Sequence, residues 1–123
     1  MRAGPALSVG VDIVDVARMT RALRRPGFAA RCFTAAERRY CAARRLPGQH
    51  YAARFAAKEA LCKAVGRRLA WQEIELRRSE MGAPAVRVSG AAGRLLEGAC
   101  VSVSLSHCDC HAAAVALVAR EAA

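Results

Sequence analysis

The fold of this chain is decided by the stretch Arg54-Phe55-Ala56-Ala57-Lys58-Glu59-Ala60-Leu61-Cys62-Lys63-Ala64-Val65-Gly66. Its alanine-rich composition has high intrinsic helix propensity, and the glycine that ends it supplies a natural C-terminal stop. We therefore predict a long helix over residues 50–65. At helical spacing Phe55, Glu59 and Lys63 share one face, which places a carboxylate and an ammonium side by side next to apolar packing. The same pair could be an ordinary surface salt bridge, worth only about 0.3–0.5 kcal/mol.

Two lysines in this stretch differ from the other basic residues of the chain. Arginine fills eighteen of the twenty basic positions, and the two lysines, Lys58 and Lys63, flank Glu59. An ammonium is a compact point charge, whereas a guanidinium is a planar fork, so this choice indicates a need for a point charge here. Chance is the alternative, because the two residue types interchange on many surfaces.

The N-terminal segment predicts a strand that carries a second carboxylate. Residues 7–14 alternate, with Leu7, Val9, Val11 and Ile13 on one face and Ser8, Gly10, Asp12 and Val14 on the other. Asp12 stands near Gly10, where the absence of a side chain lets another group approach the backbone closely. Two carboxylates, Asp12 and Glu59, that converge from different elements amid basic residues suit Mg²⁺, which also binds phosphate oxygens.

Two shorter helices are predicted between the strand and the long helix. Asp15 can cap a helix that runs to about residue 25 and stops at Pro26-Gly27. Its inward stripe is Val16, Met19 and Leu23, and its outward stripe is Arg18, Arg21 and Arg25. The capping-box pattern Thr34-Ala-Ala-Glu37 begins a second helix, which ends before Pro47-Gly48.

The second half of the chain changes period and predicts an antiparallel sheet. Residues 74–77 and 86–88 alternate on either side of a Gly82-Ala83-Pro84 turn, Ser89 can cap a short helix, and residues 101–106 and 112–119 alternate around a second turn. Strands separated by helices early and adjacent strands late give an α+β fold, with a mainly antiparallel sheet packed against the long helix. With 123 residues, of which 54% are hydrophobic, we expect a single domain over residues 1–123.

Charge and hydropathy limit the partners and the location of the protein. No stretch approaches the roughly 20 apolar residues of a membrane span, and the N-terminus lacks a signal-peptide pattern, so we expect a cytoplasmic protein with no membrane partner. The net charge is +10, and residues 1–70 carry 15 basic and 4 acidic side chains. Such a field favours polyanions, which include nucleic acid, an anionic membrane, a phosphate-rich cofactor and an acidic protein.

Six cysteines raise two further hypotheses, a zinc site and a cysteine enzyme. The cluster His107-Cys108-Asp109-Cys110-His111 lacks the second half of a tetrahedral zinc site. Thiol and imidazole groups that are adjacent in sequence seldom provide the orienting geometry of a catalytic triad. We expect reduced thiols, because Cys32, Cys41 and Cys62 lie in helical or core patterns.

Three segments of the chain resemble the ordered motifs of holo-acyl-carrier-protein synthases, which are 4'-phosphopantetheinyl transferases. They are Gly10-Val11-Asp12-Ile13, then Arg54-Phe55-Ala56-Ala57-Lys58-Glu59-Ala60 with Lys63-Ala64, and finally Ser104-Leu105-Ser106-His107 followed by Ala112-Ala113-Ala114-Val115. No single motif is decisive. Three in order, at family-like separations over nearly the whole chain, make a specific signal.

The resemblance implies an enzyme that transfers the 4'-phosphopantetheine arm of coenzyme A to a serine of an acidic apo-acyl-carrier protein and releases 3',5'-adenosine bisphosphate. It implies that Asp12 and Glu59 bind Mg²⁺, with pyrophosphate oxygens and water in the other positions. Glu59 acting through a water molecule, or that water itself, would take the serine proton. The carrier protein would serve fatty acid or polyketide biosynthesis.

Further residue roles follow from the same resemblance. Lys63 would face the cofactor phosphates as the second catalytic residue beside Glu59. Arg54 and Lys58 would contribute to the coenzyme A surroundings, and His107 would lie near its phosphates. The family also forms trimers with active sites between adjacent subunits. The outward stripe of Arg18, Arg21 and Arg25 resembles the family's docking surface for a carrier protein, although charge patterning alone also fits a solvated helix face.

The chain departs from the family pattern directly after the long helix. Family members often carry a longer glycine-containing stretch, whereas here Gly66-Arg67-Arg68-Leu69-Ala70 leads quickly into Trp71. Arg67 and Arg68 can replace lost backbone contacts to phosphate with side-chain contacts, or can serve the helix dipole. We interpret Trp71 as a core residue at the entrance of a strand.

A nucleic-acid-binding module is the main alternative from another functional class. It rests on an isoelectric point of about 10.4 and on the arginine-rich first half. It does not explain Asp12, Glu59 or the two lysines, and the two Tyr, three Phe and one Trp lie in no recognised binding motif. We therefore expect no nucleic-acid partner.

Overall fold

The computed structural model describes residues 6–79 and 81–121 of the chain. Its elements, in order, are β1 (Ala6–Asp15), α1 (Val16–Ala22), α2 (Phe28–Cys32), α3 (Ala35–Ala42), α4 (Pro47–Val65), the 3-10 turn η1 (Trp71–Glu73), β2 (Ile74–Arg78), β3 (Pro84–Val88), α5 (Gly90–Leu95), β4 (Cys100–His107) and β5 (His111–Arg120). An antiparallel sheet has the order β1-β5-β4, and β2 and β3 form a separate antiparallel hairpin. The predicted α+β class is confirmed, with its strands divided between two sheets.

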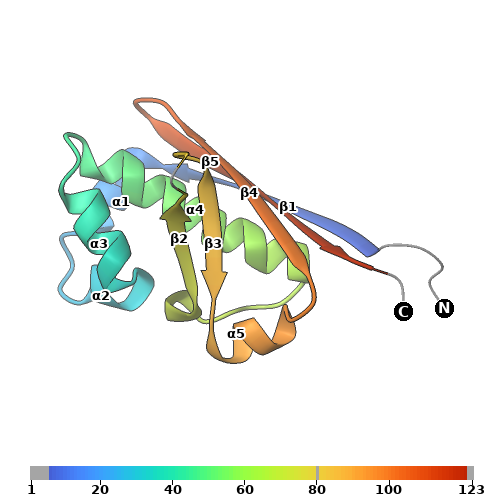
Figure 1. Cartoon of the computed structure of the whole chain (residues 1–123). Helices are drawn as coiled ribbons and strands as arrows, with labels where there is room; N and C mark the ends of the chain where they lie inside the picture. The colour runs from blue at the N-terminus through green and yellow to red at the C-terminus, as the bar shows by residue number, and fades with distance from the viewer. Residues whose placement is uncertain (1–5, 80, 122–123) are drawn as a thin grey trace.

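Helix α4 packs along the three-stranded sheet, mainly against β1 and β5 (Figure 1). It begins at Pro47, three residues before the predicted start, because proline is favoured in the first turn of a helix. It ends at Gly66, whose φ of 76° is the left-handed conformation expected of a glycine cap. Gly10 allows the close approach of β1, since an added Cβ there would lie 2.0 Å from the carbonyl oxygen of Ala60.

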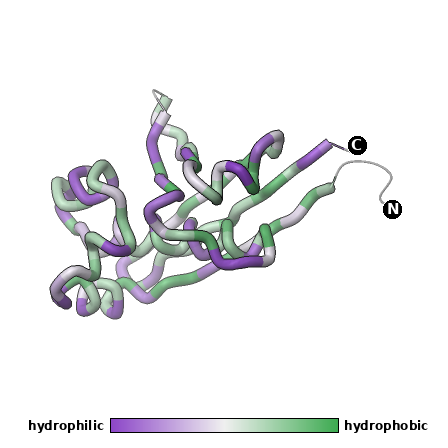
Figure 2. The backbone as a smooth tube through the Cα atoms, turned by 90° about the horizontal axis from the view of Figure 1, so that it is seen from below, coloured by the Kyte–Doolittle hydropathy of each residue, from purple (hydrophilic) through white to green (hydrophobic). Residues whose placement is uncertain are grey.

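The other face of β1 is apolar and points away from α4. We call it the β1–β5 apolar face, and it consists of Leu7, Val9, Val11 and Ile13 with Val115 and Leu117 of the neighbouring strand. The four β1 side chains are between 59% and 66% exposed. Figure 2 shows how hydrophobic residues follow the strands that lead to the two chain ends. Contiguous apolar surface of this kind marks interaction sites in soluble proteins.

The three short helices follow their capping residues. The Asp15 carboxylate accepts a hydrogen bond from the Arg18 backbone N–H at 2.8 Å, as expected of an N-cap. The predicted extension of α1 to residue 25 is wrong, because the chain leaves the helix after Ala22 ahead of Pro26, which disfavours helical conformation in the residue before it. Helix α2 was not predicted. The capping box of Thr34 and Glu37 is confirmed at the start of α3.

The second half of the chain closes the fold with a different capping arrangement from the predicted one. Ser89 makes no side-chain cap at α5. Instead, the Glu73 carboxylate accepts hydrogen bonds from the backbone N–H groups of Ala91 and Ala92 at 3.3 and 3.0 Å. Trp71, in η1, packs partly buried against both apolar clusters of the interior, as expected of a core residue. Within residues 6–79 and 81–121, the helices are too short or too polar to cross a membrane.

Candidate active site

A cavity of about 330 Å³ lies between β1, α1 and α4. Among the residues that line it are Asp12, Asp15, Arg18, Arg25, Phe55 and Glu59. The strand carries Asp12 on the face that packs toward α4, and the helix carries Glu59 directly before Ala60, the residue that Gly10 contacts. The structure therefore brings the two predicted metal ligands, which are 47 positions apart in sequence, to one cavity.

Each of these carboxylates pairs with a cationic side chain. Lys63 Nζ donates to Asp12 Oδ1 at 3.1 Å and to the Val11 carbonyl oxygen at 3.0 Å. Arg68 Nη1 donates to Glu59 Oε1 at 2.9 Å. Glu59 and Lys63 therefore do not pair with each other within the helix. Lys63 pairs with β1, and Glu59 pairs with the segment after Gly66. The side chains of Asp12 and Glu59 are 18% and 21% exposed, so both carboxylates open to the cavity without being fully solvated.

The donor set fits a magnesium ion shared with a phosphate ligand. Carboxylate oxygens are hard ligands, and Mg²⁺ is usually held by one or two carboxylates with waters and substrate phosphates completing its octahedron. No group of three or more His, Cys, Asp or Glu side chains in the described ranges could hold a metal ion. Residues 107–111 lie within those ranges.

Lys58 lies in the interior and does not line the cavity, and its predicted place in the coenzyme A surroundings stays a prediction. Its side chain and that of Glu37 are 0% exposed and are joined at 2.8 Å. The same ammonium donates to the carbonyl oxygens of Cys32 at 2.8 Å and Trp71 at 2.9 Å, which uses all three of its donors. Burial lowers the pKa of Lys58, and Glu37 opposes that shift. Lys58 therefore ties α4 to α2, α3 and η1 and has no surface for a ligand.

Arg54 and His107 lie in a basic aromatic cluster outside the cavity. Arg54 is 93% buried, its guanidinium lies 4.2 Å from the Tyr40 ring, and its Nε has no hydrogen-bond partner among the described residues. Arg44 and Arg78 lie over the same ring at 4.4 and 5.6 Å. Three guanidinium groups around one tyrosine make a strongly positive surface.

The imidazole of His107 approaches this cluster through His50, with ring centroids 5.2 Å apart. Tyr40 contacts His50 edge-on at 5.9 Å. Burial lowers the pKa of His50, and the neighbouring His107 lowers it further. His50 thus lies between His107 and Tyr40, and the predicted roles of Arg54 and His107 at coenzyme A stay predictions.

The three arginines of the predicted docking stripe are all exposed, but they do not form one uniform row. Arg18 and Arg25 line the cavity, whereas Arg21 does not. Arg25 lies beyond the end of α1, with its guanidinium 5.2 Å from the Phe28 ring. The stripe therefore borders the same cavity that the two carboxylates share.

Arg68 is the site residue whose contact the sequence did not predict. The sequence drew attention to it through the short segment after Gly66, but gave no partner for it. In the structure its guanidinium also lies 4.8 Å from the Trp71 ring and 4.0 Å from Cys62 Sγ. The sequence does place Arg68 two positions after Gly66, the cap of the helix, and Glu59 lies on the last two turns of that helix. This proximity was the signal available for the pair.

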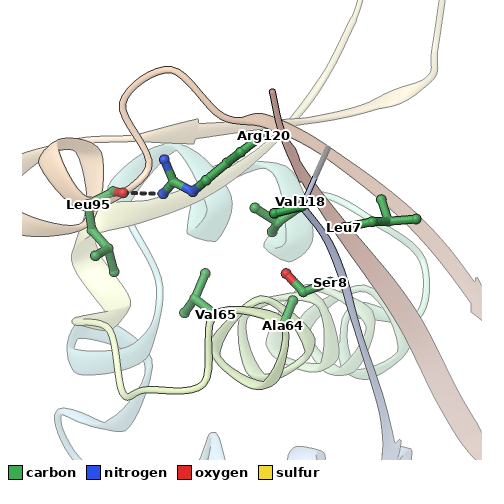
Figure 3. Close-up of a pocket in the computed structure, with 8 residues that line it drawn as sticks. Leu7, Ser8, Ala64, Val65, Leu95, Val118 and Arg120 are labelled. Carbon is green, nitrogen blue, oxygen red and sulfur yellow. Dashed lines mark hydrogen bonds between the residues drawn. The ribbon is translucent and has the colours of Figure 1, made fainter. Parts of the chain in front are cut away.

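A second cavity, of about 390 Å³, lies at the far end of α4 beside the start of β1 (Figure 3). Ala64, Val65 and Val118 give it an apolar wall, with Ser8 at the strand. Arg120 donates to the carbonyl oxygens of Leu95 and Glu97. Its lining residues include no carboxylate and no thiol. The cavity that holds both predicted metal ligands, Asp12 and Glu59, is the candidate active site.

Residues 8–118 match the family model described as the 4'-phosphopantetheinyl transferase superfamily. The holo-[acyl-carrier-protein] synthase of Moorella thermoacetica is 48% identical over 119 residues, which cover 91% of this chain and 93% of that protein. The chain belongs to the holo-acyl-carrier-protein synthase family of 4'-phosphopantetheinyl transferases. The predicted family and enzyme class are confirmed.

Other members of the family agree in sequence and in fold. The holo-[acyl-carrier-protein] synthase of Ruminiclostridium cellulolyticum is 42% identical over 120 residues, 89% of this chain and 90% of that protein. The solved structure described as the Chronobacterium ammoniagenes ACPS-CoA complex superposes with a TM-score of 0.81 at 31% identity, covering 96% and 99% of the two chains. The Helicobacter pylori synthase in complex with coenzyme A gives a TM-score of 0.80 at 28% identity, covering 89% and 98%.

Proposed function

We propose that this enzyme transfers the 4'-phosphopantetheine arm of coenzyme A to a serine of an acidic apo-acyl-carrier protein and releases 3',5'-adenosine bisphosphate. One observation carries the proposal: Asp12 and Glu59 line the same cavity in a chain of this family. Relatives of this chain are named holo-acyl-carrier-protein synthases, and both solved structures described above are complexes with coenzyme A. We place the reaction in the cytoplasm, on a carrier protein of fatty acid or polyketide biosynthesis.

The roles of the cavity residues follow from their charges. Asp12 and Glu59 would hold Mg²⁺, which when bound supplies positive charge to the pyrophosphate in the transition state. Lys63 sits on the last turns of α4 with its ammonium at Asp12, where it would hold a cofactor phosphate and keep the strand carboxylate in place. The serine proton would pass to Glu59 through a water molecule or to that water.

A trimer would complete the site and cover the β1–β5 apolar face. The described residues leave this face open, and burying it against a second copy would remove a contiguous apolar surface from water. In one chain the basic aromatic cluster with Arg54 and His107 lies outside the cavity of Asp12 and Glu59. We propose that the cluster of one subunit and the cavity of its neighbour share a coenzyme A molecule, with the phosphates near Arg54 and His107.

The carrier protein would dock at Arg18, Arg21 and Arg25. These side chains are exposed, and two of them border the cavity, so an acidic helix bound there would bring its serine toward the carboxylates. Charge complementarity of this kind raises the encounter rate and selects the partner.

The direct test is incubation of the protein with an apo-acyl-carrier protein, coenzyme A and Mg²⁺, followed by intact mass spectrometry of the carrier. We expect a gain of about 340 Da, the mass of the transferred arm, which reports turnover and not binding alone. Chelation of divalent cations should abolish the gain, and a carrier whose acceptor serine is replaced by alanine is the control. An unmodified carrier after prolonged incubation with several apo-carriers would contradict the proposed function.

A further inference from the structure

Glu59 is held from outside the cavity by a side chain that is free to leave. Arg68 Nη1 lies 2.9 Å from Glu59 Oε1, yet the Arg68 side chain is 63% exposed. Exposed ion pairs of this kind are worth little, so the contact can break at low cost. The pair therefore restrains Glu59 without locking it.

Two further contacts give the guanidinium a place to stay when it leaves the carboxylate. It lies 4.8 Å from the face of Trp71 and 4.0 Å from Cys62 Sγ. A guanidinium stacks well on an indole, and this attraction does not depend on Glu59. Arg68 can thus remain beside the site after its partner changes.

The same reasoning does not apply to the other cation of the site. Lys63 belongs to α4 itself and donates to the Val11 carbonyl oxygen as well as to Asp12, so it bridges helix and strand. Arg68 comes from the segment after Gly66, where the chain has already left the helix. Lys63 is also exposed, at 55%, but it has a second hydrogen bond on the strand backbone, whereas the contacts of Arg68 beyond Glu59 are to Trp71 and Cys62.

We propose that Arg68 is a positioning residue that occupies Glu59 while the cation site is empty and moves from Glu59 to a phosphate of coenzyme A when a divalent cation takes its place. The proposal rests on the proposed function, which supplies the cation and the phosphate. Both an arginine and a divalent cation are attracted to the Glu59 carboxylate, and their like charges repel each other there. Arg68 consequently weakens cation binding to the empty enzyme and strengthens it once an anionic cofactor is present.

The test is a calorimetric titration of the full chain with Mn²⁺ as the probe, in the absence of coenzyme A. We expect Arg68→Gln to bind Mn²⁺ about 3-fold to 5-fold more tightly than the wild type, the size of a lost exposed ion pair. Arg67→Gln is the matched control, because it removes the same charge from the neighbouring position, and the Arg67 side chain forms no ion pair within the described ranges. Its Mn²⁺ affinity should change less.

A second measurement separates the exchange from a general charge effect. In the Glu59→Gln background, adding Arg68→Gln should leave Mn²⁺ affinity unchanged, because the competition for the carboxylate is already gone. Coenzyme A, titrated at saturating Mn²⁺, should bind Arg68→Gln several-fold more weakly than the wild type. Equal or weaker Mn²⁺ binding by Arg68→Gln than by Arg67→Gln, including no binding at all, would overturn the proposal.

The fate of the proposed function is read separately, from the mass of the carrier protein with the wild-type enzyme. A wild type that modifies its carrier, combined with an Arg68→Gln chain of unchanged Mn²⁺ affinity, overturns the exchange alone. A wild type that leaves every carrier unmodified overturns the proposed function, and the Mn²⁺ titration then still decides whether Arg68 competes for Glu59.

Discussion

Lys58 and Glu59 are neighbours in the sequence and belong to two different regions of the molecule. Lys58 has no exposed surface, and its three donors are all used by Glu37, Cys32 and Trp71. Glu59 faces a cavity, is 21% exposed and pairs with one exposed side chain. One step along α4 separates a fully satisfied structural ion pair from a carboxylate with unused hydrogen-bonding capacity.

The difference teaches how to distinguish structural charges from functional ones on one helix. Consecutive residues of a helix point about 100° apart, so Lys58 and Glu59 face different environments although both belong to the same motif. A buried charge must have its partners within the protein, whereas a charge that binds a ligand must keep capacity for it. Structural and functional charges therefore differ in how exposed the side chain is and in whether its hydrogen-bonding groups already have partners in the protein, and not in residue type.

The largest expected effect is on stability, at the buried pair. Lys58→Ala leaves the Glu37 carboxylate buried without its cation, which should cost about 3–5 kcal/mol in the free energy of unfolding. Urea denaturation followed by circular dichroism measures this loss. Lys63→Ala is the matched control in the same helix, and its exposed pair should cost less than about 1 kcal/mol. If both variants lost the same free energy of unfolding, the Lys58–Glu37 pair would be no more important to stability than an exposed pair.

The next largest effect is on turnover, at the cavity. Asp12→Asn and Glu59→Gln each keep the side-chain shape but remove a hard anionic ligand, so the rate of carrier modification should fall by more than about 100-fold. Thermal unfolding should change little, because neither carboxylate is buried in the core. Rates near the wild-type value at saturating Mg²⁺ would show that these carboxylates do not hold the cation.

A smaller effect is expected at the arginines around the cavity. Because Arg18 lines the cavity itself, Arg21→Glu is the cleaner probe of the docking surface. Its kcat/KM for an acidic carrier should fall by roughly 10-fold at low salt, and the deficit should shrink as salt screens the attraction. The KM for coenzyme A should not change.

The control for this docking test is Arg39→Glu, which reverses a charge on the exposed side of α3. It should leave kcat/KM for the carrier close to the wild-type value. If Arg21→Glu behaved like this control across a salt series, the outward side of α1 would be an ordinary solvated surface.

The smallest effect concerns pH and the basic aromatic cluster. Burial lowers the pKa of His50 below its ordinary value of 6.5, so between that value and the lower folded value the unfolded chain binds more protons than the folded one. The free energy of unfolding of the wild type should therefore decrease as pH falls through this window. His50→Gln should lose less stability over the same range in parallel urea titrations. Identical pH dependence would mean that His50 titrates normally.

Local signals in the sequence predicted much of the fold. Asp15, the Thr34–Glu37 capping box and Gly66 each fixed a helix end, because a cap depends on residues close in sequence. Helix α2 was missed because its five residues are too few to show a helical period. The exposure of the apolar face of β1 was also not evident, since alternation gives two faces without saying which one is covered.

The sequence pointed to part of the candidate site, and the contacts that it missed have a common cause. Asp12 and Glu59 were singled out by the strand and helix patterns and then by the family resemblance, and the cavity brings them together. The interior position of Lys58 was not predicted, because its partners, Glu37 and two backbone carbonyls, lie 13 to 26 positions away and have no sequence signal. Arg68 was missed as a partner of Glu59 for the same reason. Contacts between segments depend on packing, which local patterns do not encode.

The most direct measurement is the position of a bound divalent cation in crystals grown with coenzyme A and Mn²⁺. Anomalous difference density locates Mn²⁺ independently of the protein model. We predict a peak between the carboxylates of Asp12 and Glu59, with the Lys58–Glu37 pair unchanged in the interior. A peak at the His107–His111 turn, or an ordered coenzyme A with no peak at the two carboxylates, would contradict the assignment of this cavity as the active site.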